Sequence, residues 1–137
     1  MLTIIKQKEL KDLKFLICKH CGNMVTIVKD MGVPIICCGE PMTALQPNRV
    51  DASQEKHVPS VTVSGASVIV NIGEAPHPML DEHHIEWVAL ETKHGKQFRR
   101  LSPCEHPKAT FLVEDDTPVA AYAYCNLHGL WKTDIPV

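Results

Sequence analysis

The stretch Val58–Ile72, with the sequence VPSVTVSGASVIVNI, decides the fold of this chain. It contains two β-branched runs, Val58–Val63 and Val68–Ile72, which are separated by the turn-forming pair Ser64-Gly65. β-Branched residues favour strands, and a glycine-containing pair between two such runs is typical of a β-hairpin. The stretch therefore predicts two antiparallel strands.

The same pattern continues toward the carboxyl terminus. Further strand-like segments are separated by the pair His94-Gly95 and by the acidic turn 114–118. The segments are Ile85–Leu90, Lys96–Leu101, Ala109–Val113, Val119–Ala123 and Trp131–Asp134. Together with the first two, they give about seven short strands in roughly 90 residues, which predicts an all-β fold containing an antiparallel sandwich of immunoglobulin-like architecture.

The amino-terminal third of the chain has a different composition. Four of the six cysteines lie before residue 39, and the polar stretch Pro47–Gln54 separates them from the strand-like segments. We therefore expect two domains, residues 1–45 and 46–137. The first is close to the size of about 40 residues below which a hydrophobic core seldom suffices without a metal or disulfides. One helix, Gln7–Leu13, is considered, but its lysine-rich composition fits a frayed segment equally well.

The first four cysteines have the pattern of a metal site. Cys18 and Cys21 form a C-x-x-C pair, whereas Cys37 and Cys38 are adjacent. Consecutive extended residues point to opposite faces, so both can bind one ion only if the backbone bends there, and Gly39 relieves the restriction on such a turn. Four thiolates predict a distorted tetrahedral site for iron or zinc, and the spacing alone does not distinguish the two metals.

A second set of candidate ligands lies in the carboxy-terminal part of the chain. Its members are three upstream histidines and the cysteine and histidine of the run Cys125-Asn126-Leu127-His128, namely His57, His77, His83, Cys125 and His128. Four nitrogens and one sulfur exceed the four ligands that zinc usually takes. They suit iron, which accepts five ligands and keeps a sixth position open. A cysteine thiolate as the axial ligand would push electron density onto the iron.

These two ligand sets, in this order, resemble the desulfoferrodoxin family of two-iron superoxide reductases, and the likeness includes the segment Gly39–Met42 after the adjacent cysteines. The resemblance covers nearly the whole chain. It implies a small desulforedoxin-like module, also similar to rubredoxin, followed by an immunoglobulin-like sandwich. It also implies a rubredoxin-like iron on Cys18, Cys21, Cys37 and Cys38, and a catalytic iron on His57, His77, His83, Cys125 and His128.

The activity that the resemblance implies is the one-electron reduction of superoxide to hydrogen peroxide, an antioxidant oxidoreductase reaction. A rubredoxin-like donor would re-reduce the catalytic iron, and the family suggests a homodimer. Glu55 and Lys56 match the family's glutamate and lysine beside the open iron face. Lys56 would attract the anion and stabilise the product, and Glu55 would occupy the sixth position of oxidised iron.

Two other classes of protein are considered. An iron electron-transfer protein without superoxide chemistry would need a sixth ligand, such as Met79, to close the second site. A zinc-ribbon interaction module would put zinc on the four cysteines but leaves the second ligand set unexplained. We interpret Cys104 as a loop thiol without a role, and the alternative is a redox or accessory metal site shared with His106.

Composition argues against several partners. The net charge of −2 gives no basic footprint for nucleic acid. No segment reaches the roughly 18 apolar residues of a spanning helix, and lysines interrupt the amino terminus before a signal peptide can form, so we expect no membrane association and a cytoplasmic location. Cysteines in a cytosolic chain more often bind metals than form disulfides.

Overall fold

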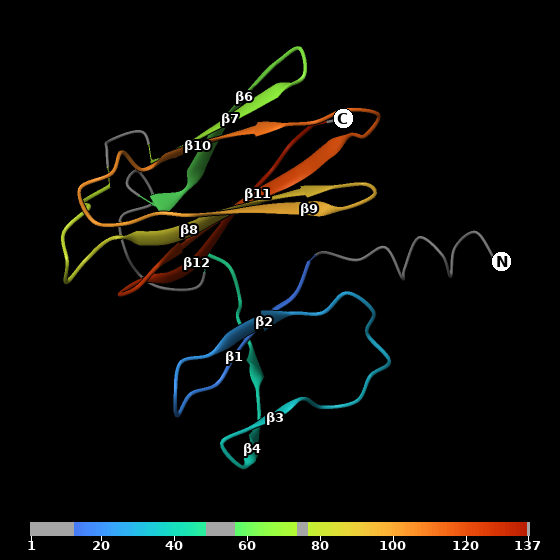
Figure 1. Cartoon of the computed structure of the whole chain (residues 1–137), viewed down its shortest axis with the longest axis vertical. Coiled ribbons are helices and arrows are strands. Elements are labelled where there is room, and N and C mark those ends of the chain that lie inside the picture. The colour runs from blue at the N-terminus through green and yellow to red at the C-terminus, as the bar shows by residue number, and fades with distance from the viewer. Residues whose placement is uncertain (1–12, 49–56, 74–76, 137) are drawn as a thin grey trace, which may run out of the picture. The chain divides into compact units, whose positions relative to one another are not determined.

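The computed structural model describes residues 13–48, 57–73 and 77–136. The elements described below are β strands, and the chain divides into two compact units, residues 1–45 and 46–137 (Figure 1). Most of the helix considered for Gln7–Leu13 and most of the linker Pro47–Gln54 lie outside the described residues. Within the described part, no helix is long and apolar enough to cross a membrane.

The described part of the first unit contains five very short strands. Three of them, β1 (Phe15–Ile17), β2 (Met24–Thr26) and β5 (Thr43–Ala44), form an antiparallel sheet in the order β2-β1-β5. The other two, β3 (Ile36–Cys37) and β4 (Glu40–Pro41), pair as a separate hairpin. Strands of two or three residues are too short to show a period of two, so the sequence analysis predicted a metal module here but no strands.

This unit buries few apolar side chains. Phe15 and Cys18 are each 3% exposed, whereas Val28, Met31 and Val33 in the long loop before β3 are 92%, 73% and 71% exposed. A domain with so little apolar burial needs another source of stability. The four cysteines are the residues that can supply it, because a bound metal converts its binding free energy into folding free energy.

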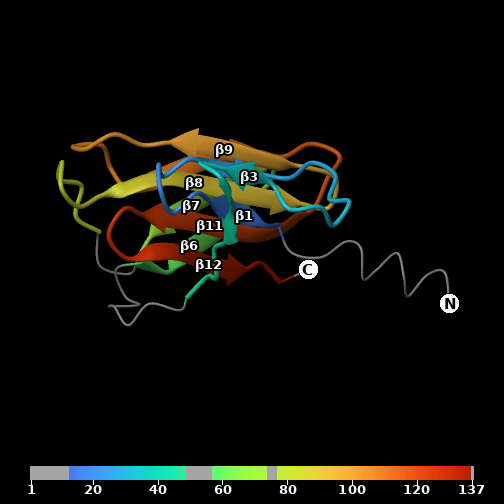
Figure 2. The ribbon, with the colours of Figure 1, turned by 90° about the horizontal axis from the view of Figure 1, so that it is seen from below.

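The second unit is a sandwich of two antiparallel sheets. The first sheet has the order β10-β7-β6 and contains β6 (Pro59–Ser64), β7 (Ser67–Ile72) and β10 (Lys108–Leu112). The second has the order β12-β11-β8-β9, visible side by side in Figure 2, and contains β8 (Ile85–Thr92), β9 (Lys96–Arg100), β11 (Pro118–Cys125) and β12 (Gly129–Asp134). The seven predicted strands and the sandwich are confirmed.

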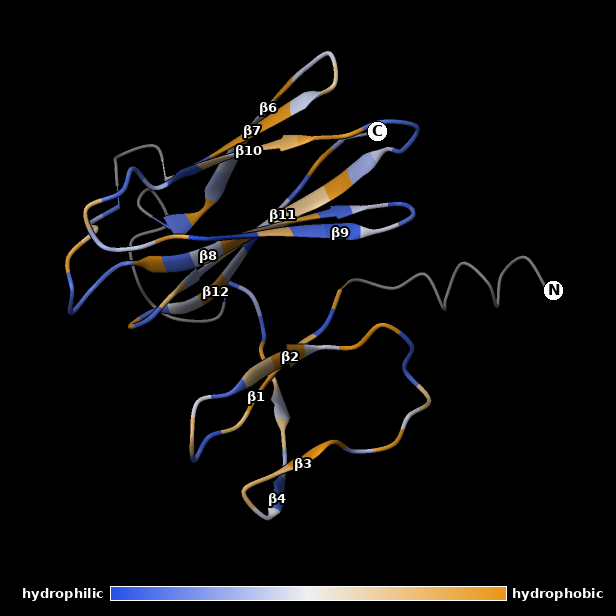
Figure 3. Cartoon of the chain, viewed as in Figure 1, coloured by the Kyte–Doolittle hydropathy of each residue, from blue (hydrophilic) through white to orange (hydrophobic). Residues whose placement is uncertain are grey.

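The connections follow immunoglobulin topology with one difference. If β6 to β12 are named A to G, the first sheet is A-B-E and the second contains C-F-G, as in immunoglobulin domains. The fourth strand, β9, pairs with β8 instead of β10, with Trp87 opposite Arg100. In a constant-type domain the fourth strand belongs to the other sheet. Strand β9 therefore forms an edge, and its hydrophilic colour in Figure 3 reflects the charges that discourage pairing with another chain.

The core lies between the two sheets and follows the alternation seen in the sequence. On β7, Val68, Val70 and Ile72 are at most 1% exposed, while Asn71 faces solvent. The core cluster consists of apolar residues from both sheets, namely Val68, Val70, Ile72, Ile85, Val88, Leu90, Leu101, Ala109, Phe111, Ala121, Ala123 and Cys125. One candidate metal ligand, Cys125, thus belongs to the core and is held as rigidly as its apolar neighbours.

A polar network closes the end of the sandwich that carries the β8–β9 turn. The Thr92 hydroxyl donates to Asp116 Oδ2 at 2.6 Å, and the backbone N–H groups of His94 and Thr117 donate to Asp116 Oδ1 at 3.2 and 2.8 Å. The Thr92 hydroxyl is the main cause that lowers the pKa of Asp116 to about 2, followed by the Thr117 amide and then by the side chain and amide of His94. The carboxylate form of Asp116 therefore stabilises the folded chain.

The stability advantage of wild type over Asp116→Asn should depend on pH. Because the folded-state pKa of Asp116 lies below its usual value of about 4, the advantage should be fully present above pH 4 and be lost as the pH falls toward 2. Urea unfolding at pH 7 and pH 3 measures this difference. Asp115→Asn, which changes the exposed neighbour outside the network, is the control. An equal difference in unfolding free energy between wild type and Asp116→Asn at pH 7 and pH 3 would contradict the lowered pKa of Asp116.

Candidate metal centres

The first two cysteines lie on a tight turn after β1. Cys18 follows the strand, and the Gly22 N–H donates to the Cys18 carbonyl at 2.9 Å, closing the turn around Cys21. Gly22 has φ +85°, a conformation that L residues rarely adopt. This closure lets both sulfurs of the C-x-x-C pair point to the same side of the turn.

The adjacent cysteines are accommodated by a hairpin turn. Cys37 ends β3, and the two residues that connect it to β4 are Cys38 with φ 52° and Gly39 with φ 77°. Positive φ at both central residues is the signature of a type I′ turn, the usual two-residue hairpin connection. The backbone bend that the sequence analysis required is present, and it begins at Cys38 itself rather than only at the glycine.

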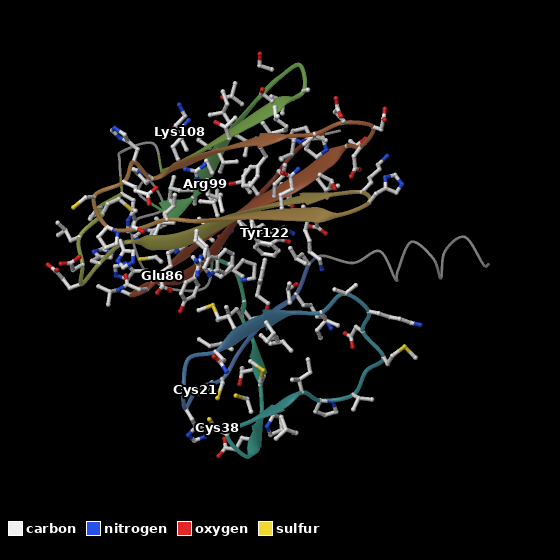
Figure 4. The ribbon with its side chains drawn as sticks, in the orientation of Figure 1. Cys21, Cys38, Glu86, Arg99, Lys108 and Tyr122 are labelled. Atoms are coloured by element: carbon white, nitrogen blue, oxygen red, sulfur yellow. The ribbon has the colours of Figure 1, made fainter. Side chains whose placement is uncertain are left out.

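The four sulfurs converge on one point. The candidate ligand atoms of Cys18, Cys21, Cys37 and Cys38 all lie within 4.8 Å of one another, and the Sγ atoms of Cys21 and Cys37 are 3.7 Å apart. Two sulfurs bound at about 2.3 Å in a tetrahedron would be about 3.8 Å apart. In Figure 4, Cys21 and Cys38 lie on neighbouring turns of the small unit. The donor set therefore fits a tetrahedral ion.

Backbone and side-chain donors surround these sulfurs. The Asn23 N–H donates to Cys21 Sγ at 3.5 Å, and Asn23 Nδ2 contacts Cys37 Sγ at 3.8 Å. The Cys21 amide is the main cause that lowers the pKa of Cys18 to about 6, whereas the sulfur of Cys18 is the main cause that raises the pKa of Cys38 to about 12. The first thiol of the cluster therefore ionises easily, whereas a further thiol resists ionisation beside it. A bound cation would offset the repulsion between neighbouring thiolates and favour their ionised forms.

The second set of candidate ligands gathers at one end of the sandwich. His57 lies just before β6, and His83 lies just before β8. Cys125 ends β11, where it pairs with Ile85 of β8 and with Gly129 of β12. Because antiparallel neighbours bring the end of one strand beside the start of the next, residues far apart in the sequence meet here.

The four imidazole rings form a square. Ring centroids of successive neighbours are 4.6 Å apart for His57 and His77, 4.7 Å for His77 and His83, 5.0 Å for His83 and His128, and 4.8 Å for His128 and His57. The diagonal from His57 to His83 is longer, at 6.3 Å. Neighbouring rings are close to perpendicular, with interplanar angles between 77° and 87°. A square of four rings provides equatorial ligands, which a tetrahedral ion does not use.

The ligand atoms agree with this arrangement. Those of His57, His83, Cys125 and His128 lie within 4.8 Å of one another. His57 Nε2 and His128 Nδ1 are 3.0 Å apart, about the separation of two nitrogens bound at right angles at about 2.1 Å. Cys125 Sγ is 3.9 Å from His128 Nδ1. The set fits a metal with a square of nitrogens and one sulfur.

His77 is outside that four-residue group, but its ring occupies the fourth corner of the square. Its Nδ1 is 2.6 Å from the Pro78 carbonyl oxygen, which can only accept, so Nδ1 carries the proton. Its Nε2 is buried and has no hydrogen-bond partner among the described residues. Burial is the main cause that lowers the pKa of His77 to about 4. At neutral pH this imidazole is therefore uncharged and presents a bare nitrogen, as a metal ligand must.

Cys125 has the properties of a thiol that needs a cation in order to ionise. Its side chain is fully buried, and burial is the main cause that raises its pKa. The backbone amides of Leu127 and His128 act in the opposite direction and lower the pKa. A metal ion beside this sulfur would favour the thiolate, which is the ligand form.

Two residues near the site were not singled out from the sequence. The indole of Trp131 stacks on the His57 ring at 4.9 Å with an interplanar angle of 26°, and Trp131 is 1% exposed. The side chain of Asn126 contacts the chain on both sides of His83, at Glu82 and His84. A single tryptophan or asparagine carries no spacing signal, and only its place next to a ligand run could have suggested a role.

The other candidate residues are not members of the two ligand groups that the described residues form. Glu55 and Lys56 lie outside the described residues. Met79, the alternative sixth ligand, packs against the hydrophobic core. Cys104 is an exposed free thiol and belongs to neither of the two ligand groups found among the described residues. His20, inside the C-x-x-C pair, is exposed and forms an ion pair with Glu40 at 3.1 Å.

The fold and the two centres define a class of protein with two separate metal sites, one of four cysteines and one of histidines and a cysteine. A family model described as Desulfoferrodoxin matches residues 49–134. The desulfoferrodoxin of Clostridium acetobutylicum is 40% identical over 124 residues, which cover 90% of this chain and 98% of that protein. The superoxide reductase of Pyrococcus horikoshii is 35% identical over 62% of this chain and 90% of that protein.

Solved structures show the same relationship. The crystal structure of the superoxide reductase from Treponema pallidum matches with a TM-score of 0.76 and 36% identity, over 90% of this chain and 100% of that chain. A one-iron superoxide reductase from Giardia intestinalis matches with a TM-score of 0.53 and 33% identity, over 61% of this chain and 99% of that chain. This chain belongs to the desulfoferrodoxin family.

Proposed function

We propose that the protein is a superoxide reductase that holds two mononuclear irons, one on the four cysteines and one on the four histidines and Cys125. The observation that carries the proposal is the square of four imidazoles with a buried cysteine beside it. Five protein ligands leave one position of a six-coordinate ion for a small substrate. The family relationship to superoxide reductases supports superoxide as that substrate.

The four histidines and Cys125 would hold this iron, which when bound would supply the one electron that, with two protons from water, reduces superoxide to hydrogen peroxide. A rubredoxin-like donor would return the electron. The protein holds the site ready for this chemistry. The Pro78 carbonyl fixes the tautomer of His77, and the Trp131 indole fixes the plane of the His57 ring. The rigid core around Cys125 keeps the sulfur in place. Such preorganisation keeps the ligands from rearranging during turnover.

Several finer assignments belong to the same proposal. The ligand roles of the nine residues and the domain roles of residues 1–45 and 46–137 are supported by the two convergent ligand groups. Iron rather than zinc at the four cysteines is supported by the family relationship. The homodimer and the donor rest on the family alone. Six free cysteines agree with a reducing cytoplasm, where thiols stay reduced.

A direct test is to measure metal content and product together. We expect two irons per chain in protein purified without chelators. Reduced protein mixed with superoxide should form one hydrogen peroxide for each superoxide consumed and one oxidised iron, with no oxygen released. Release of oxygen in equal amount with peroxide would indicate dismutation instead. One iron, or zinc alone, would contradict the two-iron assignment.

Lys56 and Glu55 are proposed to act on the substrate side of the site, because they precede the ligand His57 directly. Lys56→Ala should slow the bimolecular reaction with superoxide by about tenfold or more at low salt and should weaken its dependence on ionic strength, since electrostatic steering typically gives factors of about 10–1,000. Pulse radiolysis measures both quantities. Glu55→Ala, at the adjacent position, should leave this rate nearly unchanged and alter the spectrum of the ferric form. A wild-type rate and salt dependence in Lys56→Ala would remove the steering role.

A further inference from the structure

Asn126 connects two of the segments that carry the ligands. It lies between Cys125 and His128 in the sequence, and its side chain reaches across to the segment that contains His83. Its Oδ1 accepts the His84 N–H at 2.9 Å, and its Nδ2 donates to the Glu82 carbonyl at 3.0 Å. The backbone N–H of Asn126 donates to the His84 carbonyl at 3.2 Å. Three hydrogen bonds thus bracket His83 on both sides.

Asn126 lies where the backbone hydrogen bonds between β11 and β8 end, so a side chain is needed to join the two segments beyond that point. The ladder between β11 and β8 ends with Cys125 opposite Ile85, after an irregularity between Tyr124 and Cys125. Beyond that point the two strands diverge into loops. The backbone bond of Asn126 extends the ladder by one step, and its amide group then replaces the next backbone pair by offering one donor and one acceptor.

We propose that Asn126 is a positioning residue that fixes the His83 segment against the turn carrying Cys125 and His128, and thereby sets the geometry of three ligands of the second metal site. The inference rests on the proposed function of that site. It goes beyond the proposed function because Asn126 contacts the backbone of the ligand segment and is not itself a ligand.

Further hydrogen bonds form within the His83 segment. Leu80 and His83 exchange two backbone hydrogen bonds, at 2.9 and 3.2 Å, and His84 Nδ1 lies 2.9 Å from the Leu80 carbonyl oxygen. These bonds shape the turn but do not place it relative to Cys125. In the described part of the chain, loss of the Asn126 side-chain amide would leave Asn126 with its backbone bond to the His84 carbonyl as its link to the His83 segment. The His83 ring would then adopt a wider range of positions around the ion.

The test compares iron retention and spectrum in Asn126→Ala, Asn126→Asp and the control Asn71→Ala, which makes the same change on the exposed face of β7. Groups that orient metal ligands are typically worth about 10–100-fold in metal affinity. Asn126→Ala should lose iron from the histidine site to a chelator about 10–100-fold faster than wild type, and its sulfur-to-iron absorption band should shift or broaden. Asn71→Ala should match wild type in both measurements.

Asn126→Asp separates the two side-chain bonds. The carboxylate keeps the acceptor for the His84 N–H and loses the donor to the Glu82 carbonyl, while its shape is nearly unchanged. It should therefore also lose iron faster than wild type. If Asn126→Ala failed to fold, this variant would decide: faster iron loss supports the positioning role and wild-type iron loss overturns it.

The outcomes distinguish this inference from the proposed function. Wild-type protein that binds iron, together with an Asn126→Ala variant that has the same iron-loss rate and the same absorption band, would overturn the positioning role alone. Wild-type protein that binds no iron at the histidine site would overturn the proposed function and this inference with it. A variant with lower thermal stability but a wild-type band and iron-loss rate would show a purely structural role and would also overturn the inference.

Discussion

Cys125→Ser should abolish the sulfur-to-iron absorption band of the second site and nearly all reduction of superoxide. Cys125 is the only cysteine in its ligand group, and its side chain is fully buried in the core. A serine hydroxyl at this place would be nearly isosteric, but it does not ionise near neutral pH as a metal-bound thiol does. The variant therefore removes the thiolate that would bind the metal while disturbing the packing little.

The expected loss of activity in Cys125→Ser can be compared with the loss caused by removing groups that only orient a metal ligand. Removing groups that merely orient a ligand costs about 10–100-fold in affinity or activity. Loss of the only sulfur ligand should exceed this, so we expect the rate with superoxide to fall by more than about 100-fold. Stopped-flow or pulse radiolysis gives the rate, and visible absorption of the ferric form gives the band.

Cys104→Ser is the matched control, because it makes the same chemical change at an exposed thiol outside both ligand groups. It should leave rate and spectrum unchanged. A Cys125→Ser variant with normal absorption and activity would place the sulfur ligand elsewhere, and Cys104 would be the remaining candidate. Opposite behaviour of the two variants would support the ligand role of Cys125 without relying on the family relationship.

The sandwich could be predicted because its strands are long enough to show a pattern. The two β-branched runs around Ser64-Gly65 gave β6 and β7, and the burial of alternate residues on β7 is the physical basis of that pattern. The pairing of β9 with β8 could not be predicted in the same way. A charged edge strand such as KQFRR has no apolar face that selects one sheet over the other.

In the metal centres too, some features could be predicted from the sequence and others depend on the three-dimensional structure. Cysteine and histidine are chemically distinctive, so their spacing was enough to propose two ligand groups. The structure adds the Cys38-Gly39 turn, which explains how adjacent cysteines face one point, and the square of imidazole rings. Trp131 and Asn126 act through stacking and through backbone contacts with distant segments. The Asn126 contacts depend on the pairing of β11 with β8, and the Trp131 stacking depends on the packing of β12 beside the start of β6. No local sequence pattern specifies either arrangement.

Removing the metal from the four-cysteine site should unfold the first unit while the sandwich strands stay folded. The first unit has a very small core, with long apolar side chains such as Val28 and Met31 exposed to solvent. Structural zinc sites contribute apparent free energies of about 10–16 kcal/mol to the folding of small domains. A strong chelator under reducing conditions, with amide signals followed by NMR, should therefore collapse the signals of residues 14–45 and retain those of β6 to β12.

The physical reason is that the ion joins parts of the unit that are otherwise in different sheets. Cys18 follows β1 in the three-stranded sheet, whereas Cys37 and Cys38 belong to the β3–β4 hairpin. Cys18→Ser should reproduce the effect of the chelator and remove the rubredoxin-like absorption, while the histidine-bound metal remains because the two groups share no residue. His20→Ala, in the same turn, should keep both the metal and the fold. Dispersed signals from residues 14–45 after complete metal loss would show that strand pairing and Phe15 suffice to fold this unit, and the structural role given to the metal would have to be withdrawn.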